Sequence, residues 1–252
     1  MRLVAALLAV ASMGCQSAPS SPDPTPTGTT AGARVLFIGN SLTQFNGLSG
    51  MVRALARQAG EPLSVEEITF PGFSLEDHWN EGSARRAIGR GGWRYVVLQQ
   101  GPSSLPESRE NLLLWAGRFN QAIRSAGARP AFYSVWPDIT RSAFFDDVSE
   151  SYRQAAATTD GLLLPAGEAW RAAWRRQPDL ALYGEDKFHP SVRGSYLAAL
   201  VICAQVLGRA PAGLATPLAR EEGTMAAFTP TATEAALLQE AAAEAIREHG
   251  RP

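Results

Sequence analysis

A serine near the start of the chain is a candidate for nucleophilic chemistry. Ser41 follows the apolar run of residues 34–38, at a turn between a predicted strand and a predicted helix. There its hydroxyl could attack a carbonyl carbon, and nearby backbone N–H groups could face an oxyanion. The Gly-Asn-Ser-Leu segment of residues 39–42 is by itself more typical of ordinary turn and helix-capping chemistry. A nucleophilic serine therefore needs a base elsewhere in the chain.

The chain has three histidines, and one of them is placed to act as that base. We expect His78, within a polar helical stretch, and His249, near the C-terminus, at the solvated surface. His189 precedes Pro190, which disfavours the α conformation at His189 and suits the first position of the helix that follows. Asp186 can fold back to accept the Nδ1 proton of His189, which leaves Nε2 free to take a proton from a serine.

The elements that must position these residues alternate between short apolar runs and helical patterns. The predicted strands span residues 34–38, 63–70, 94–100, 131–136 and 161–165. The predicted helices span about residues 48–55, 75–88, 107–126, 144–158, 168–176, 196–207 and 231–249. This alternation predicts an α/β fold in which a parallel sheet carries helices on both faces. Ligands bind such sheets at the carboxyl ends of the strands, which is where Ser41 stands.

Composition excludes several classes of protein. The chain has 252 residues, of which 45% are apolar and 19% charged, as in a globular domain. Its formal net charge of −1 argues against binding to nucleic acid or to an anionic membrane surface. Two cysteines, Cys15 and Cys203, exclude a disulfide framework and a cysteine-built zinc or iron–sulfur site. We expect no metal and no other cofactor, and we expect Cys203 to be a buried thiol.

Residues 1–14 have the order of an export signal. Arg2 precedes an apolar run of nine residues, which is too short for the roughly 20 residues that cross a bilayer. The segment Ser12-Met13-Gly14-Cys15 resembles the lipobox of bacterial lipoproteins, in which the cysteine is lipidated and becomes the first residue of the mature chain. We therefore expect an exported protein that contacts the membrane only through a lipid on Cys15. An ordinary secretory signal, cut nearby, is the alternative.

Two further segments follow the predicted signal. Residues 15–33 are rich in Ser, Pro and Thr and hold no large aliphatic or aromatic residue, so they predict a solvated tether. Residues 34–250 have the length of a single domain. The sequence favours no particular oligomeric state.

The two chemical motifs together resemble the SGNH (GDSL-like) hydrolases. Gly39-Asn40-Ser41-Leu42 is similar to the first block of that family, and Asp186-x-x-His189-Pro190 to its last block. The resemblance implies a three-layer α/β/α esterase with a five-stranded, parallel, flavodoxin-like sheet. It also implies that Ser41, Asp186 and His189 form a catalytic triad. The Gly-x-Ser-x-Gly nucleophile elbow of the larger α/β-hydrolases is absent.

The second block of the family is a glycine after the second strand, whose backbone N–H helps to bind the oxyanion. Residues 70–74 read Phe-Pro-Gly-Phe-Ser, and a Pro-Gly pair favours a tight turn with an exposed amide. The resemblance therefore implies an oxyanion hole that includes the N–H groups of Ser41 and Gly72.

The third block departs from the family pattern of Gly-x-Asn. Residues 98–104 read Leu-Gln-Gln-Gly-Pro-Ser-Ser and contain no asparagine. Gln100 could supply the missing donor, because a glutamine carries the same two amide N–H groups one methylene further out. Gln99 and Ser103 are the alternatives.

The reaction implied is hydrolysis of a carboxylic ester through an acyl-enzyme. An exported enzyme at the cell envelope leads us to expect a short-chain ester or a carbohydrate O-acyl ester, such as an acetyl ester, as substrate. Aromatic residues near strand ends could stack on a sugar or pack on an acyl chain, although core packing explains each equally well: Phe45, Phe73, Trp79 and Trp136. The alternative is a noncatalytic envelope protein that binds a glycan in a degraded SGNH site, as the altered third block would allow.

Overall fold

The computed structural model describes residues 32–214 and 226–250. The predicted signal of residues 1–14, Cys15 and most of the predicted tether lie outside the described residues. Among the residues that are described, no helix is both long and apolar enough to cross a bilayer.

Five parallel strands form one sheet in the order β2-β1-β3-β4-β5. The strands are β1 (Arg34–Gly39), β2 (Ser64–Thr69), β3 (Trp93–Leu98), β4 (Arg129–Tyr133) and β5 (Leu162–Leu164). The strand β1 lies in the interior of the sheet, where Ile38 pairs with Ile68 of β2 on one side and with Leu98 of β3 on the other. The carboxyl ends of these three strands therefore meet at one edge of the sheet.

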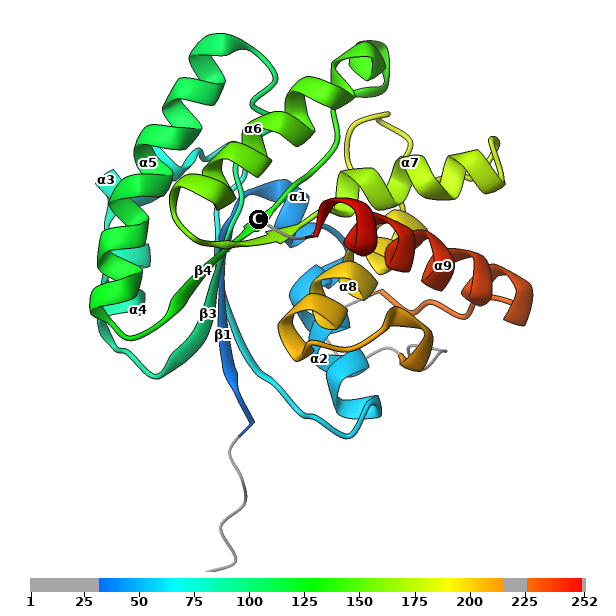
Figure 1. The fold of residues 1–252 in the computed structure, drawn as a ribbon, viewed down its shortest axis with the longest axis horizontal. Helices are drawn as coiled ribbons and strands as arrows, with labels where there is room; N and C mark the ends of the chain where they lie inside the picture. The colour runs from blue at the N-terminus through cyan, green and yellow to red at the C-terminus, as the bar shows by residue number, and fades with distance from the viewer. Residues whose placement is uncertain (1–31, 215–225, 251–252) are drawn as a thin grey trace, which may run out of the picture. The chain divides into compact units, whose positions relative to one another are not determined.

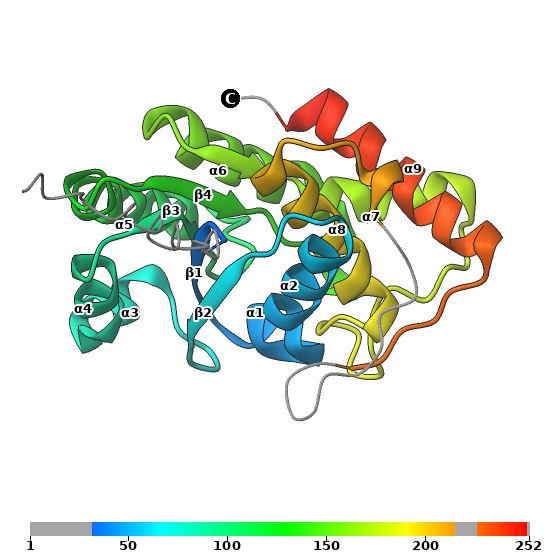
Figure 2. The ribbon, with the colours of Figure 1, turned by 90° about the horizontal axis from the view of Figure 1, so that it is seen from below.

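Helices cover both faces of the sheet (Figures 1 and 2). One layer consists of α3 (Leu75–Glu81), α4 (Ser83–Gly89), α5 (Pro106–Ser125) and α6 (Phe145–Thr158). The other consists of α2 (Leu48–Gln58), α7 (Ala166–Arg176), α8 (Val192–Leu207) and α9 (Ala232–His249). The short helical turns are α1 (Ser41–Gln44), η1 (Phe45–Gly47), η2 (Ile139–Phe144) and η3 (Pro211–Gly213). The predicted three-layer α/β/α fold with a five-stranded parallel sheet is confirmed.

Burial on both faces explains why the central strands are apolar without alternation. Val35 to Ile38 of β1 have no solvent exposure, because helices pack on each side of that strand. Cys203 lies in the equally apolar α8 and is fully buried, as predicted, and burial raises the pKa of its thiol to about 12. Its thiolate is therefore inaccessible at neutral pH.

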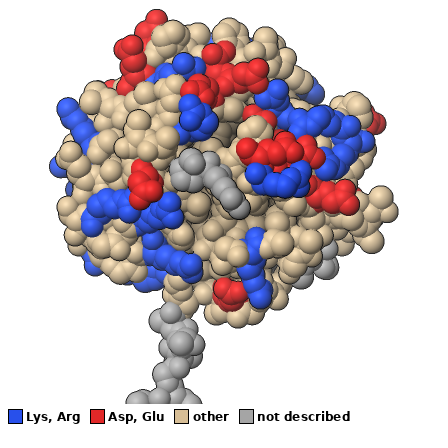
Figure 3. Space-filling model, in the orientation of Figure 1, with Lys and Arg blue, Asp and Glu red and all other residues tan. Residues whose placement is uncertain are grey.

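Charged side chains of both signs alternate over the face drawn in Figure 3. Ion pairs join some of them, and the terminal helix α9 is held to α7 in this way, since Glu244 lies 2.5 Å from Arg175 and 2.6 Å from Arg176. On the apolar side of α9, Leu238 and Ala241 are buried against α7 and α8. The terminal helix thus packs on other helices.

Two expected element boundaries were wrong. The stretch of residues 75–88 is not one helix, because Gly82 takes a left-handed conformation with φ of 92° and ends α3 before α4 begins. Pro190 does not occupy the first helical position of α8. The helix begins at Val192, Ser191 caps it through a bond from Gly194 N–H, and Pro190 instead pairs with Tyr183 in a short antiparallel bridge.

The expectation that His78 is solvated was also wrong. His78 has no solvent exposure, and its Nε2 donates to the carbonyl oxygen of Gly39 at 2.8 Å. The capping box formed by Ser74 and Asp77 starts α3 so that His78, one turn later, faces the end of β1. Burial lowers the pKa of the His78 imidazole, because the charged form loses its hydration. His249 is only partly exposed, with its Nε2 3.7 Å from a carboxylate oxygen of Glu168.

His78 makes the stability of the protein depend on pH in a predictable direction. An unfolded histidine binds a proton near pH 6.5, whereas the buried His78 binds one only at lower pH. As pH falls below about 6.5 the unfolded state gains protons first, so the free energy of unfolding decreases. We expect His78→Gln, which keeps a donor for Gly39, to lose part of this pH dependence in urea unfolding at pH 7.5 and 5.5. Equal pH dependence in both proteins would contradict the assignment.

Candidate active site

Ser41, His189 and Asp186 lie side by side at the carboxyl edge of the sheet. The distance from His189 Nε2 to Ser41 Oγ is 2.8 Å, and the distance from His189 Nδ1 to Asp186 Oδ2 is 2.5 Å. Ser41 begins α1 directly after β1, and the other two residues lie in the loop before α8. In this geometry the imidazole can accept the serine proton while the carboxylate holds the ring orientation. The structure brings together the three residues selected from the sequence, and their use in catalysis stays a prediction.

The loop that carries the histidine is held by Asp186 itself. Its Oδ1 accepts hydrogen bonds from the backbone N–H groups of Phe188 at 3.0 Å and His189 at 2.9 Å. Lys187, between them, takes a left-handed conformation with φ of 62°. The hydrogen bond from His189 and these backbone bonds lower the pKa of Asp186 to about 2. Asp186 is therefore ionised at neutral pH even though its side chain is half exposed.

The segment just after the nucleophile holds the base from the other side. The ring of Phe45 stacks on the imidazole of His189, with ring centroids 4.1 Å apart and an interplanar angle of 11°. Asn46 Nδ2 donates to the carbonyl oxygen of Pro190 at 3.0 Å and to Ser195 Oγ at 2.9 Å. Asn46 is a site residue that the sequence motifs did not single out. Its signal was the Asn-Gly pair of residues 46 and 47, which favours the left-handed conformation that Asn46 adopts with φ of 57°.

Two backbone N–H groups of the cleft are free to bind a negatively charged oxygen. Ser41 N–H belongs to the first residue of α1, and Gly72 N–H lies in a tight turn closed by a bond from Phe73 N–H to Phe70 O at 3.1 Å. Gly72 has φ of 77°, which favours glycine at this position of the turn. Within the described part of the chain, neither N–H has a hydrogen-bond acceptor. Both residues line the same cleft.

Of the three candidates for the missing third donor, which were Gln99, Gln100 and Ser103, the structure excludes Gln99. This side chain is fully buried, and its Oε1 accepts from Asn40 N–H at 2.9 Å and from Thr43 Oγ1 at 2.7 Å. Its Nε2 donates to Asn40 Oδ1 at 2.9 Å and to the carbonyl oxygen of Gln100. Since both amide hydrogens are engaged, Gln99 has none left for an oxyanion.

Gln100 remains the best placed of the three. Its Oε1 accepts from Leu75 N–H at 3.1 Å, and its Nε2 donates one hydrogen to Ser103 Oγ at 2.9 Å. One amide hydrogen of Gln100 is left over, and the residue lines the cleft. The hydroxyl of Ser103 donates to the carbonyl oxygen of Gly101 at 3.2 Å. The role of Gln100 as an oxyanion donor stays a prediction.

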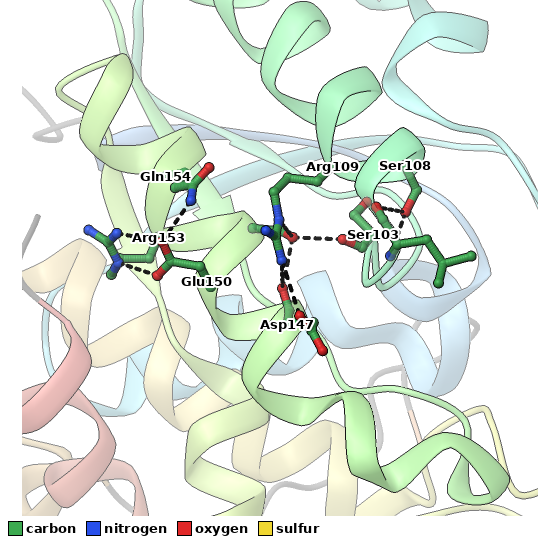
Figure 4. A network of polar contacts seen from close by, with 9 residues as sticks. Ser103, Ser108, Arg109, Asp147, Glu150, Arg153 and Gln154 are labelled. Atoms are coloured by element: carbon green, nitrogen blue, oxygen red, sulfur yellow. Dashed lines mark hydrogen bonds and ion pairs between the residues drawn. The ribbon is translucent and has the colours of Figure 1, made fainter.

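Contacts from two helices anchor the loop of residues 101–104 (Figure 4). Ser151 Oγ of α6 lies 2.7 Å from the carbonyl oxygen of Ser103, and Arg109 Nε of α5 donates to the same Ser151 oxygen at 2.8 Å. Arg109 also lies 3.4 Å from a carboxylate oxygen of Asp147. These bonds hold Ser103 in its left-handed conformation, with φ of 57°. The loop that directly follows Gln99 and Gln100 is therefore anchored to both α5 and α6.

Ser41, Gly72 and Gln100 line a cleft of about 630 Å³. The wall of the cleft is mixed. Its apolar part includes Pro102, Leu105, Pro137 and Phe188, and its polar side chains include Ser74, Ser104, Ser108, Asn111, Asp138 and Arg141. Phe73 contributes an aromatic surface to the cleft. Trp79 and Trp136, the two tryptophans considered as possible substrate contacts, pack inside the protein instead. Trp136 is fully buried and stacks on Trp170 with centroids 3.5 Å apart, and Trp79 packs edge-on against Phe119.

The fold and this arrangement define a three-layer α/β protein with a Ser-His-Asp site at the sheet edge. No family model and no curated protein matches the sequence. Among solved structures, a candidate SGNH hydrolase from Slackia heliotrinireducens is 27% identical, with a TM-score of 0.60 over 69% of this chain and 98% of that one. A DUF4886 family protein from Bacteroides uniformis is 18% identical, with a TM-score of 0.69 over 85% of this chain and 95% of that one.

A third match is an acetylxylan esterase from Geobacillus stearothermophilus, which is 16% identical, with a TM-score of 0.56 over 70% of this chain and 94% of that one. These matches confirm the resemblance drawn from the motifs: the chain has the fold of the SGNH-like hydrolases. The identities below 25% establish shared fold alone.

The bonding of Gln99 leads to a testable prediction about the nucleophile. Gln99→Met keeps the length of the side chain but leaves Asn40 N–H and the Thr43 hydroxyl without their buried acceptor. We expect a loss of about 1–3 kcal/mol in the free energy of unfolding. We also expect the rate at which a fluorophosphonate labels Ser41 to fall about 100-fold, because the turn that presents this serine loosens.

Gln205→Met is the matched control for this variant. The amide nitrogen of Gln205, like that of Gln99, donates two hydrogen bonds, here to the carbonyl oxygens of Leu163 at 3.0 Å and Gly250 at 2.9 Å, but Gln205 lies outside the cleft. The control is expected to lose stability and keep the labelling rate. If Gln99→Met keeps the labelling rate as well, Gln99 does not position the nucleophile.

Proposed function

We propose that the protein is a serine esterase that hydrolyses carboxylic esters through an acyl-enzyme. The observation that carries this proposal is the unbroken chain of hydrogen bonds from Ser41 Oγ through His189 to the ionised carboxylate of Asp186. Ser41, at one end of this chain, lines a cleft together with Gly72, and no described group accepts a hydrogen bond from the backbone N–H of either residue. The named structural matches include an acetylxylan esterase and a lipase/acylhydrolase, which supports ester hydrolysis in general.

The geometry supports the following reaction. His189 Nε2 takes the proton of Ser41 Oγ as this oxygen attacks the ester carbonyl carbon, and the charge that develops on the carbonyl oxygen is bound by the N–H groups of Ser41 and Gly72. His189 then gives its proton to the leaving alcohol, so that the acyl group remains on Ser41. In the second half of the reaction, His189 takes a proton from water as the water attacks the acyl-enzyme. His189 then returns this proton to Ser41 Oγ as the carboxylic acid leaves. The remaining N–H of Gln100 would supply a third hydrogen bond to the oxyanion.

We infer that the substrate is a short-chain ester or a carbohydrate O-acyl ester, with acetyl as the first choice. The hydroxyls of Ser74, Ser104 and Ser108 and the amide of Asn111 in the mixed wall of the cleft suit an alcohol part that carries hydroxyl groups. In the alternative, the same cleft binds a glycan without hydrolysing it.

Substitution of Ser41 distinguishes the esterase from the glycan-binding alternative. We expect the wild-type protein to react with a fluorophosphonate probe and to hydrolyse p-nitrophenyl acetate, and Ser41→Ala to abolish the labelling and lower kcat about 10⁶-fold, to background. Ser49→Ala serves as the control, because Ser49 bonds to Glu67 outside the cleft. A wild-type protein that shows neither labelling nor turnover would exclude the esterase and leave the glycan-binding alternative.

We also propose that the protein is exported and anchored to a bacterial envelope by a lipid on Cys15, with residues 15–33 as the tether. The support is the order of charge, apolar run and small residues before Cys15 in the sequence. We expect labelled palmitate to be incorporated into the wild-type protein in a bacterial host and not into Cys15→Ala. Cys203→Ala, which removes the other cysteine, is expected to retain the label. Wild-type protein released from cells without lipid would indicate an ordinary secretory signal instead.

A further inference from the structure

A second cavity, of about 430 Å³, opens next to the candidate active cleft. Its wall is built from η2, from the first residue of α6, from α7 and from the chain that follows α7. The residues that line it are Ile139, Ser142, Phe145, Trp174, Pro178, Asp179, Leu180, Ala181, Leu182, Tyr183 and Lys187. None of them belongs to the hydrogen-bonded chain from Ser41 to Asp186.

The two cavities share a wall that is only two chain segments thick. Along the first segment, Asp138 and Arg141 line the cleft, whereas Ile139 and Ser142 line the second cavity. Along the other, Phe188 lines the cleft and the preceding residue lines the second cavity. Neighbouring residues therefore face opposite sides of one ridge.

Hydrogen bonds hold this ridge in place. The backbone N–H of Ile139 donates to the carbonyl oxygen of Lys187 at 3.1 Å, which joins the two segments. Tyr183 Oη donates to the carbonyl oxygen of Pro137 at 2.7 Å, which ties the ridge to the floor of the second cavity. A ligand that crosses the ridge would meet a preformed surface, so little binding energy is lost in ordering it.

The lining of the second cavity combines aromatic rings with groups that can bond hydroxyls. Trp174 and Tyr183 are both partly exposed and stack with centroids 5.7 Å apart, at an interplanar angle of 28°. The exposed side chains of Asp179, Lys187 and Ser142 surround them. Aromatic surface next to charged and hydroxyl groups fits the C–H and O–H groups of a sugar ring better than it fits an alkyl chain.

We propose that the second cavity binds a sugar unit of an oligosaccharide whose ester-bearing unit occupies the cleft at Ser41. This inference rests on the proposed esterase function. It adds that the enzyme prefers an esterified oligosaccharide to an esterified single sugar. The connecting sugars lie across the ridge between Ile139 and Lys187. The prediction for the wild-type enzyme is a kcat/KM about tenfold higher on O-acetylated xylohexaose than on an O-acetylated methyl xyloside, mainly through KM.

The variant Ser142→Trp tests this assignment without removing any packed side chain. Ser142 is exposed on η2 and lines the second cavity, so an indole there fills the space. The neighbouring Ala143 is exposed and lines neither cavity, so Ala143→Trp is the matched control. We expect the ratio of kcat/KM for the two esters to fall to about one in Ser142→Trp and to stay near its wild-type value in Ala143→Trp.

Two outcomes overturn the proposal: no chain-length preference in the wild type, or an equal ratio in the two tryptophan variants. Failure of the esterase function itself would be seen separately, as absence of p-nitrophenyl acetate turnover by the wild type. In that case, titration calorimetry with unesterified xylohexaose tests whether the second cavity binds sugar, independently of ester hydrolysis. Weaker binding to Ser142→Trp than to Ala143→Trp supports the sugar site, and equal or absent binding to both rejects it.

Discussion

The buried amide of Gln99 is the interaction on which the geometry of the site depends. It crosses from the end of β3 to the turn after β1, where it accepts from Asn40 N–H and Thr43 and donates back to Asn40 Oδ1. Asn40 in turn donates to the carbonyl oxygen of Phe73 at 3.1 Å, next to the glycine of the second loop. A single saturated amide thus fixes the nucleophile turn relative to two neighbouring strand ends. Because a buried amide left unpaired costs far more than a solvated one, this arrangement has few alternatives.

The same constraint explains why uncharged groups fill the space beneath the candidate oxyanion site. His78 bonds to Gly39 O in a fully buried position, and burial lowers its pKa so that it is neutral at neutral pH. Gln99 and Gln100 hold the adjoining strand end without adding charge. An ionised group at this depth would lose its hydration, and a buried anion would also compete with the oxyanion for the N–H groups of Ser41 and Gly72. The charged partner of the site, Asp186, instead lies at the solvent side, where the ionised form is easily maintained.

Local features of the site could be predicted from the sequence because they depend on residues close together in the chain. Asp186 and His189 are three residues apart, so one loop forms their contact whatever the rest of the fold does. The Pro-Gly pair before Phe73 forms its tight turn for the same reason. Buried strands were visible as uninterrupted apolar runs, since a parallel sheet covered on both faces has no solvated side. His78 was misjudged because the polar pattern of its own helix does not show which partner that helix packs against.

The α/β class, the five strands and the three candidates Ser41, Asp186 and His189 could be predicted from the sequence alone. Which glutamine is free to donate could not, because Gln99 and Gln100 differ in their distant partners and not in their chemistry. The same holds for the hydrogen bond between Ser41 and His189, which are 148 residues apart. Such contacts depend on the register of parallel strands and the packing of α8, which arise from many weak interactions across the whole core and leave no local signal in the chain.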